Sequence, residues 1–268
     1  YKRQPMNHPP PSSPPGFSLA GKIIVLTGGA GLYGRGLAAQ VAAAGATLIL
    51  ASRNVAALEL VAAEERALGR NVQARSLDQA EESSVLQLRD SVLREFGRVD
   101  GLINNAVSRP MKSARGPLAE WEASMKTNAT GIFAITRAFG EKMAAHGSGS
   151  IVNIGSIQGM VGPDFSLYEG LNMDAIPDYF FHKAGMANLT RYFAAFYGPQ
   201  GVRVNCVAPG GFFSGQHPTF VERYAKATFL RRMADENDLG GPVIFLLGDS
   251  ARYVTGVNLP VDGGYTAH

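Results

Sequence analysis

The sequence predicts an α/β protein in which a doubly wound sheet of seven parallel strands carries helices on both faces. Short, mostly apolar runs alternate along the chain with longer segments of helical periodicity. The apolar runs lack the alternation of polar and apolar residues that a solvent-facing strand shows, which indicates strands buried on both faces. A glycine-rich turn also joins the first apolar run to the first helical segment.

Length and composition set the domain organisation that we expect. At 268 residues the chain is long enough for one large α/β domain. We expect residues 19–268 to form this single domain. Residues 1–18 are rich in Pro and Ser and lack periodicity, so we expect them to be a disordered arm.

Composition also argues against several classes of function. The net charge is only +3, and no basic stripe with interleaved aromatic residues predicts nucleic-acid binding. No Cys/His cluster has metal-ligand spacing, so we expect no metal site. We expect no membrane partner, because there is neither a run of ~18 apolar residues nor an apolar secretory signal. The single Cys206 favours a reducing compartment, and we expect a cytoplasmic protein.

Each element of the sheet is predicted from a short apolar run bounded by polar or glycine residues. In chain order the predicted strands are 22–27, 46–51, 72–77, 101–104, 150–155, 202–207 and 257–261. The segments between them that predict helices are 37–44, 55–68, 81–96, 118–145, 177–197 and 241–248. Segment 118–145 is interrupted near Asn128 and Gly131, and residues 212–235 are predicted to be irregular or helical.

The turn T-G-G-A-G-L-Y-G-R-G at residues 27–36 predicts a dinucleotide site. Glycine lets the backbone approach a pyrophosphate, and the start of the following helix supplies free N–H groups and a positive dipole end. A second strand begins about twenty residues after the first one, which makes a βαβ unit of the expected size. The fold is therefore predicted to be Rossmann-type.

The end of the second strand predicts which dinucleotide binds. Ser52 and Arg53 stand where an acidic residue would bind a ribose 2′-hydroxyl, and no carboxylate follows until Glu59. An arginine at this place accommodates a 2′-phosphate. We therefore expect NADP(H), with NAD(H) as the alternative. Asp78, after the third strand, could hydrogen-bond an adenine amino group.

Tyr179 and Lys183 form a candidate acid/base pair. They stand four residues apart, so on a helix both side chains point to one face. Free tyrosine has a pKa near ~10, and a positive charge within ~4–6 Å favours the phenolate. Such a tyrosine can protonate an alkoxide or deprotonate an alcohol near neutral pH. Because Tyr-x-x-x-Lys also occurs by chance, the pair indicates catalysis only together with the rest of the chain.

The chain resembles the short-chain dehydrogenase/reductase family over essentially all of residues 19–265. Five motifs occur in the family's order: the glycine turn at 27–34, Asp78, N-N-A at 104–106, Ser156 with Y-x-x-x-K at 179–183, and P-G at 209–210. The ending T-G-V-N-L-P-V-D-G-G at 255–264 is also similar to the family's. The resemblance implies hydride transfer between a nicotinamide and a ketone or secondary alcohol.

The resemblance also implies roles for individual residues. Tyr179 would be the acid/base, Lys183 would bind the nicotinamide ribose, Ser156 would hold the substrate oxygen, and Asn128 would kink its helix and position a water. Together with the glycine turn and Arg53, it predicts these cofactor-binding residues: Gly28, Gly31, Leu32, Tyr33, Gly34, Ser52, Arg53, Asn54, Leu77, Asp78, Asn105, Ala106, Val107, Tyr179, Lys183, Pro209, Gly210 and Phe212.

The sequence departs from the family's pattern at several places. Leu32 replaces the middle glycine of the turn, Val107 replaces the glycine after N-N-A, and P-G is followed by G-F-F. Ser156 and Tyr179 are 23 residues apart, roughly twice the usual spacing, so we interpret Pro163–Pro177 as an inserted loop over the substrate. Tyr168 has the usual spacing, but Asn172 stands where its lysine should be, and we therefore choose Tyr179.

The substrate is less closely defined than the chemistry. Leu32 together with a Y-E-G-x-N-M insertion resembles a sub-branch, with an extended loop between Ser and Tyr, that is often met among bacterial carbohydrate-modifying enzymes. Cations at Arg109, Lys112 and Arg115 could attract an anionic substrate or could simply be solvated. The inserted loop brings Asp164, Glu169, Asn172 and Asp174, which could hydrogen-bond the hydroxyls of a polyol, a sugar ketone or another hydroxylated ketone.

Two further expectations complete the prediction. The resemblance implies a homotetramer or homodimer built through the long helices and the C-terminal strand. The alternative function is a non-catalytic dinucleotide-binding or scaffolding protein of the same fold, which Leu32 and Val107 motivate and the intact Ser156, Tyr179 and Lys183 oppose. A third hypothesis is that the protein is a dehydratase or epimerase of the same superfamily.

Overall fold

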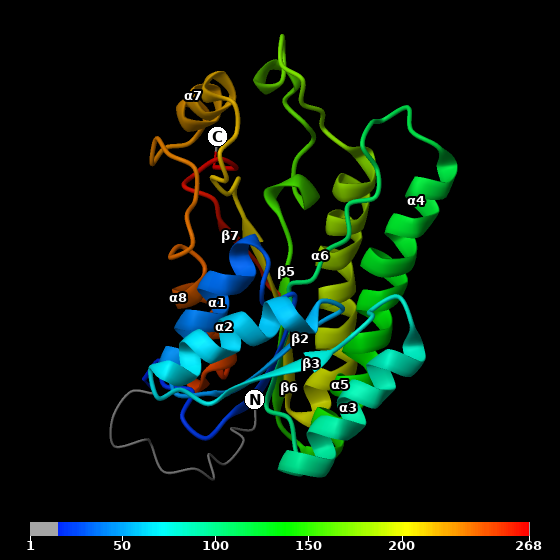
Figure 1. Cartoon of the computed structure of the whole chain (residues 1–268), viewed down its shortest axis with the longest axis vertical. Coiled ribbons are helices and arrows are strands. Elements are labelled where there is room, and N and C mark those ends of the chain that lie inside the picture. The colour runs from blue at the N-terminus through cyan, green and yellow to red at the C-terminus, as the bar shows by residue number, and fades with distance from the viewer. Residues whose placement is uncertain (1–15, 268) are drawn as a thin grey trace, which may run out of the picture.

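A seven-stranded sheet forms the centre of the computed structural model, which describes residues 16–267 (Figure 1). The strand order is β3-β2-β1-β4-β5-β6-β7, and every neighbouring pair is parallel. The strands are β1 (Ile23–Thr27), β2 (Thr47–Ser52), β3 (Val72–Ser76), β4 (Gly101–Asn104), β5 (Gly149–Ile154), β6 (Val202–Pro209) and β7 (Asn258–Val261). The predicted Rossmann-type fold class is confirmed.

Helices cover both faces of the sheet, as the burial of its strands requires. The helices are α1 (Leu32–Ala43), α2 (Val55–Ala67), α3 (Glu82–Phe96), α4 (Leu118–Met125), α5 (Gly131–His146), α6 (Pro177–Tyr197), α7 (Pro218–Ala227) and α8 (Gly240–Leu247). Side chains of α1, α2 and α8 share one apolar core with the sheet, and those of α3, α5 and α6 share the other. Figure 1 shows the two groups on opposite sides of the strands.

The sheet topology determines where a ligand can bind. From β1 the chain runs outward to β2 and β3, and then crosses back to β4 on the other side of β1. Val25 of β1 accordingly pairs with Ile49 of β2 and with Leu102 of β4. In open α/β sheets the crevice beyond the carboxyl ends of the strands, at such a reversal, is the usual ligand site. The loops after β1 to β6 meet at this edge.

Helix α1 begins at Leu32, five residues earlier than the predicted start at Leu37. Gly34 and Gly36 therefore belong to the helix and not to the turn. A Cβ on Gly34 would lie 2.1 Å from the carbonyl oxygen of Gly28, and one on Gly36 would lie 2.3 Å from that of Glu236. These glycines serve close packing between distant backbone segments, which local sequence periodicity does not indicate.

The predicted interruption of the helix at 118–145 is confirmed. Lys126–Thr130 form a π-helical turn between α4 and α5, and this turn contains Asn128. A π-helical turn shifts the hydrogen-bond register by one residue, so it reorients the side chains on either side of it.

The predicted arm at 1–18 lies mostly outside the described residues. Its residues 16–18 are described and contact the domain. The Gly16 carbonyl accepts a hydrogen bond from the Ser250 hydroxyl, and the Phe17 ring lies 6.3 Å from that of Phe245. The domain boundary at residue 19 stays a prediction. No helix among residues 16–267 has both the length and the apolar content that a membrane span needs.

Candidate active site

One cavity of about 860 Å³ follows the carboxyl edge of the sheet. Loops after each of β1 to β6 contribute to its wall, together with the start of α6 and the inserted segment. Most of the predicted site residues line it. Three of them do not: Gly34, Asn54 and Asn128. The structure therefore brings most of the predicted site residues to one cavity, and their roles stay predictions.

The glycine turn is tied to the loop after β4. The Thr27 hydroxyl oxygen accepts hydrogen bonds from the backbone N–H groups of Asn105 and Ala106, at 3.0 and 2.9 Å. The Asn105 amide in turn donates to the carbonyls of Thr27 and Gly28. Gly28 has φ +71°, and a Cβ there would lie 2.9 Å from the Cα of Ala106. Glycine is therefore required at this position by both backbone conformation and space.

The Leu32 side chain does not block access to the glycine turn. It is the first residue of α1, its side chain lies at the cavity wall, and it is 58% exposed. The preceding Gly31 caps the helix with no side-chain hydrogen bond, so the first N–H groups of α1 have no side-chain acceptor. A helix start of this kind suits a pyrophosphate. The glycine turn thus fits a dinucleotide in spite of the leucine.

The far end of the cavity is lined by Arg53 and Asp78. Within residues 16–267 no carboxylate forms an ion pair with the Arg53 guanidinium, which leaves it available to an anion. The Asn54 side chain caps α2 by accepting from the N–H of Ala57, which explains why Asn54 faces away from the cavity. Asp78 is held by its own turn, where one carboxylate oxygen accepts from the N–H of Ala80.

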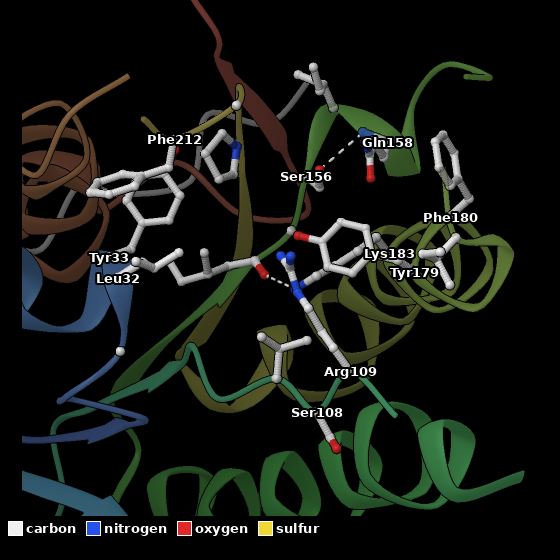
Figure 2. A pocket seen from close by; sticks show the side chains of 18 of the residues that line it. Leu32, Tyr33, Ser108, Arg109, Ser156, Gln158, Tyr179, Phe180, Lys183 and Phe212 are labelled. Carbon is white, nitrogen blue, oxygen red and sulfur yellow. Dashed lines mark hydrogen bonds between the residues drawn. The ribbon is translucent and has the colours of Figure 1, made fainter. Parts of the chain in front are cut away.

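Ser156, Tyr179 and Lys183 meet at the other end of the cavity, as Figure 2 shows. Lys183 Nζ donates to the carbonyl of Ile154 at 2.5 Å and lies 5.5 Å from the centroid of the Tyr179 ring. Burial lowers the pKa of Lys183, and the nearby Tyr179 opposes that shift. The Ser156 hydroxyl oxygen accepts from the N–H of Gln158 at 3.1 Å, at the end of β5.

Tyr168, the alternative to Tyr179, also borders the cavity but packs in a different environment. Its ring lies 5.4 Å from that of Phe220, and burial raises its pKa. It follows a short 3₁₀ turn, Phe165–Leu167, and has no lysine beside it. Only Tyr179 stands on the first turns of α6 together with a lysine, which favours our choice of tyrosine.

Asn128 holds the loop that carries Arg109. Its side-chain oxygen accepts from the N–H of Ser108 at 2.9 Å, and its amide donates to the Ser108 carbonyl at 2.7 Å and to the Ser124 hydroxyl at 2.9 Å. The side chain is 3% exposed and fully engaged. The Asn128 side chain therefore holds this loop, and the water-positioning role that the resemblance implies stays a prediction.

The structure separates the three loop cations that the sequence grouped together. The Arg109 guanidinium carbon lies 4.7 Å from the centroid of the Tyr179 ring, and Figure 2 shows its side chain reaching up beside this ring. Lys112 also lines the cavity, and its ammonium donates to the Arg109 carbonyl. Arg115 does not line the cavity. Arg109 is thus the cation closest to the candidate acid/base.

The inserted segment Pro163–Pro177 forms part of the roof, next to α7 at the top of Figure 1. Arg223 of α7 donates to the carbonyls of Ser166 and Glu169, at 3.1 and 2.7 Å. Leu167 packs with Phe220 in a small apolar cluster. Of the four polar residues that we singled out, Asp164 and Asp174 line the cavity, whereas Glu169 and Asn172 do not.

Sequence reasoning missed two buried polar residues of α6. Asp178 lines the cavity and is 2% exposed. His182 is 3% exposed, and neither ring nitrogen has a hydrogen-bond partner. Asp178 directly precedes Tyr179 and His182 follows it by three residues, so the available signal was a polar residue one or three positions from the candidate tyrosine.

Comparison with known proteins identifies the family. Residues 31–266 match a family model described as enoyl-(acyl carrier protein) reductase. The chain belongs to the short-chain dehydrogenase/reductase family. It is 32% identical, over 93% of its length and 97% of the relative's, to galactitol 2-dehydrogenase (L-tagatose-forming) of Cereibacter sphaeroides.

Solved structures of the family agree with the fold and the chemistry. A gluconate 5-dehydrogenase of Burkholderia cenocepacia, in complex with NADP and tartrate, superimposes with a TM-score of 0.86 at 28% identity, covering 94% of this chain and 98% of that one. An NAD+-bound xylitol dehydrogenase gives 0.83 at 30% identity, covering 91% and 99%. The protein is an NAD(P)-dependent oxidoreductase of CH–OH groups, and the non-catalytic alternative is not retained.

Proposed function

We propose that this short-chain dehydrogenase/reductase uses NADP(H) to interconvert a secondary alcohol and a ketone on a sugar-like, anionic polyhydroxy substrate. The observation that carries the proposal is the position of Arg109, whose guanidinium lies 4.7 Å from the Tyr179 ring centroid inside the cavity. A cation beside the candidate acid/base favours a substrate that has a negative group close to its reacting carbon.

The chain offers binding groups along the whole cavity for NADP(H). Gly28, Gly31 and the start of α1 would receive the pyrophosphate, and Asp78 would receive the adenine. Arg53 would pair with the 2′-phosphate, since it lines the cavity without an ion-pair partner among the described residues. When bound, the cofactor supplies or accepts the hydride. Both NAD+ and NADP occur in related structures, so the preference rests on Arg53.

Three residues would do the proton chemistry. Tyr179 would give a proton to the forming alkoxide or take one from the alcohol, because it stands in the cavity beside Lys183. Ser156 would hold the substrate oxygen through its hydroxyl, which a hydrogen bond from Gln158 keeps in place. The Lys183 ammonium, anchored on Ile154, would bind the ribose and stabilise the phenolate. Asn128 supports this arrangement by fixing Ser108.

The charges in the cavity and the names of the relatives support the proposed substrate class. Galactitol is a polyol and gluconate is a hydroxylated carboxylate, so the names of related proteins include both properties that we propose. The sub-branch with a long loop between Ser and Tyr stays a prediction, as does the cytoplasmic location. The Pro163–Pro177 insertion supports a hydroxylated substrate because it brings Asp174 to the cavity.

We also propose that the protein is a homo-oligomer, a dimer or tetramer that uses the long helices. Large aromatic side chains are exposed on α5 and α6: Phe133, Phe181, Tyr192 and Phe196. Exposed apolar groups on neighbouring helices favour a protein contact over solvent.

A binding experiment tests the cofactor, and a kinetic one tests the substrate. NADPH should bind the purified protein more tightly than NADH, and Arg53→Ala should lose ~10-fold or more in NADPH affinity with little change for NADH. Tighter NADH binding would contradict the role of Arg53. With cofactor bound, sugar acids should be turned over faster than neutral polyols of equal length, and Arg109→Met should remove that difference.

A further inference from the structure

Asp178 is a buried carboxylate that the protein leaves without a partner. It is 2% exposed, and among residues 16–267 no group donates a hydrogen bond to it or forms an ion pair with it. Its place in the first turn of α6 favours a negative charge. That effect is much smaller than the cost of taking a carboxylate out of water. Neither carboxylate oxygen is fully buried, however, so a donor can reach the group from the cavity that Asp178 lines.

The cavity is the place from which this donor can come. Asp178 lies in the same wall as Tyr179, its neighbour in the sequence. Successive residues on a helix project in directions about 100° apart, so the two side chains border different parts of the substrate space. Asp178 therefore faces a part of the substrate other than the oxygen that exchanges its proton with Tyr179.

At the substrate end of the cavity, positive and negative side chains come from different segments of the chain. The loop after β4 contributes the cations Arg109 and Lys112, whereas α6 and the insertion contribute the carboxylates Asp178, Asp164 and Asp174. An ammonium group would satisfy Asp178 but would be repelled by the two cations in the same cavity. A hydroxyl group donates to a carboxylate without carrying a charge. The chemistry of this end thus suits a molecule with an anionic group and hydroxyls.

We propose that Asp178 is a specificity-determining residue that accepts a hydrogen bond from a substrate hydroxyl other than the reacting one. The substrate class is a polyhydroxy carboxylate, with its anionic group at Arg109 and its further hydroxyls toward Asp178. This inference rests on the function proposed above and assigns a role within that site. A substrate that lacks this hydroxyl cannot form the charge-assisted hydrogen bond to the Asp178 carboxylate. The site should therefore discriminate strongly against such a substrate.

Asp164 provides a matched control. It lines the same cavity, but its carboxylate already accepts from the N–H and the hydroxyl of Ser166, at 2.9 and 2.6 Å. It therefore has its donors without a substrate. Asp164→Asn and Asp178→Asn remove the same charge from the same cavity, and only Asp178→Asn should remove a group that waits for a substrate hydroxyl.

The experiment compares two probe substrates in the oxidation direction with NADP+. D-Gluconate carries several hydroxyls, and cis-4-hydroxycyclohexanecarboxylate carries only the one that reacts. Asp178→Asn should raise KM or lower kcat/KM for D-gluconate by ~10- to 100-fold, the loss expected for a hydrogen bond to a charged group. It should change kcat/KM for the single-hydroxyl probe by less than about threefold. Asp164→Asn should leave the ratio between the two probes unchanged.

The outcomes distinguish a failure of the Asp178 role from a failure of the proposed substrate class. Equal losses on both probes would overturn the role of Asp178 and leave the oxidoreductase intact. No loss on D-gluconate would do the same. If the wild-type enzyme turned over neutral polyols but neither carboxylate, the proposed substrate class would fail and the Asp178 inference with it. Unchanged NADPH affinity and melting temperature would show that Asp178→Asn is folded. If either value changes, the same comparison is made with Asp178→Ser.

Discussion

Tyr179 is held from two directions before any substrate binds. The Arg109 guanidinium lies over its ring at 4.7 Å, and the His182 ring meets it edge-on, with 5.2 Å between the ring centroids. Lys183 lies one turn further along α6, its ammonium anchored on Ile154. A tyrosine restrained in this way needs little reorganisation to reach a substrate oxygen.

Replacement of this tyrosine tests its assignment as the acid/base. Tyr179→Phe should keep NADPH affinity within about threefold, because the ring remains, and should lower kcat by ~10³-fold or more, because the transferable proton is lost. Stopped-flow or steady-state oxidation of NADPH measures the loss. Tyr168→Phe is the matched control and should retain most of the turnover. The reverse result would assign the proton to Tyr168.

His182 is the second unusual residue of this helix. Burial lowers its pKa to about 3, and the neighbouring charges of Lys183 and Arg109 add to this shift. Both ring nitrogens are buried without a partner, which opposes folding. His182 is therefore neutral in the folded protein across the physiological pH range.

A leucine at position 182 should stabilise the protein, and more so in mild acid. The unfolded chain protonates this histidine below about pH 6.5, whereas the folded one does not until pH 3 is approached. Wild-type stability should therefore fall by up to ~1.4 kcal/mol for each pH unit below 6.5, and His182→Leu lacks this loss. Thermal melts at pH 7 and pH 5 measure the difference in Tm, which should widen at pH 5. A constant difference would mean that His182 titrates alike in both states.

Helix α1 packs more closely than its composition suggests. Gly34 and Gly36 would each place a Cβ within 2.5 Å of a carbonyl oxygen, of Gly28 and Glu236 respectively. In an isolated helix alanine is favoured over glycine by ~1 kcal/mol. The contacts of α1 reverse this preference, because neither backbone segment can move away without displacing the turn or the loop before α8.

Two alanine substitutions separate these effects. Gly36→Ala should destabilise the fold by ~2 kcal/mol or more through the clash with Glu236. Gly185→Ala in α6 is the matched control: a Cβ there meets nothing within 4 Å, so it should stabilise by ~0.5–1 kcal/mol. Urea unfolding of both variants measures the two free energies. A stabilising Gly36→Ala would refute the packing role of this glycine.

The exposed aromatic side chains of α5 and α6 bear on the assembly. Tyr192 and Phe196 are 58% and 57% exposed, and their rings stack on each other 6.0 Å apart. They lie on the side of the sheet opposite to α1 and α2. A second copy of the chain would remove this face from water.

Sedimentation velocity tests the assembly. The wild-type protein should sediment as a dimer or tetramer, and the double variant Tyr192→Glu/Phe196→Glu should sediment as a smaller species, because two carboxylates would be buried in the contact. Leu60→Glu on α2 introduces one carboxylate at another exposed apolar position and should leave the wild-type species unchanged. A monomeric wild-type protein would contradict the proposal.

Local patterns in the sequence were sufficient to predict the sheet, the order of the elements and the strand ends that border the cavity. Apolar runs, helical periodicity and the glycine turn depend on neighbouring residues, so they can be recognised along the chain. The Tyr179–Lys183 pair was recognisable for the same reason, since a helix brings residues four apart to one face.

Other properties depend on residues that are far apart in the chain, and these could not be predicted. The early start of α1 follows from contacts of Gly34 and Gly36 with distant carbonyls. Asn128 turned out to bind Ser108, and only Arg109 of the three loop cations reached Tyr179. The burial of Asp178 became visible only when α6 was packed against its neighbours. Burial and partnering arise from the packing of distant segments, so the charges that distinguish one substrate from another were decided by the tertiary structure.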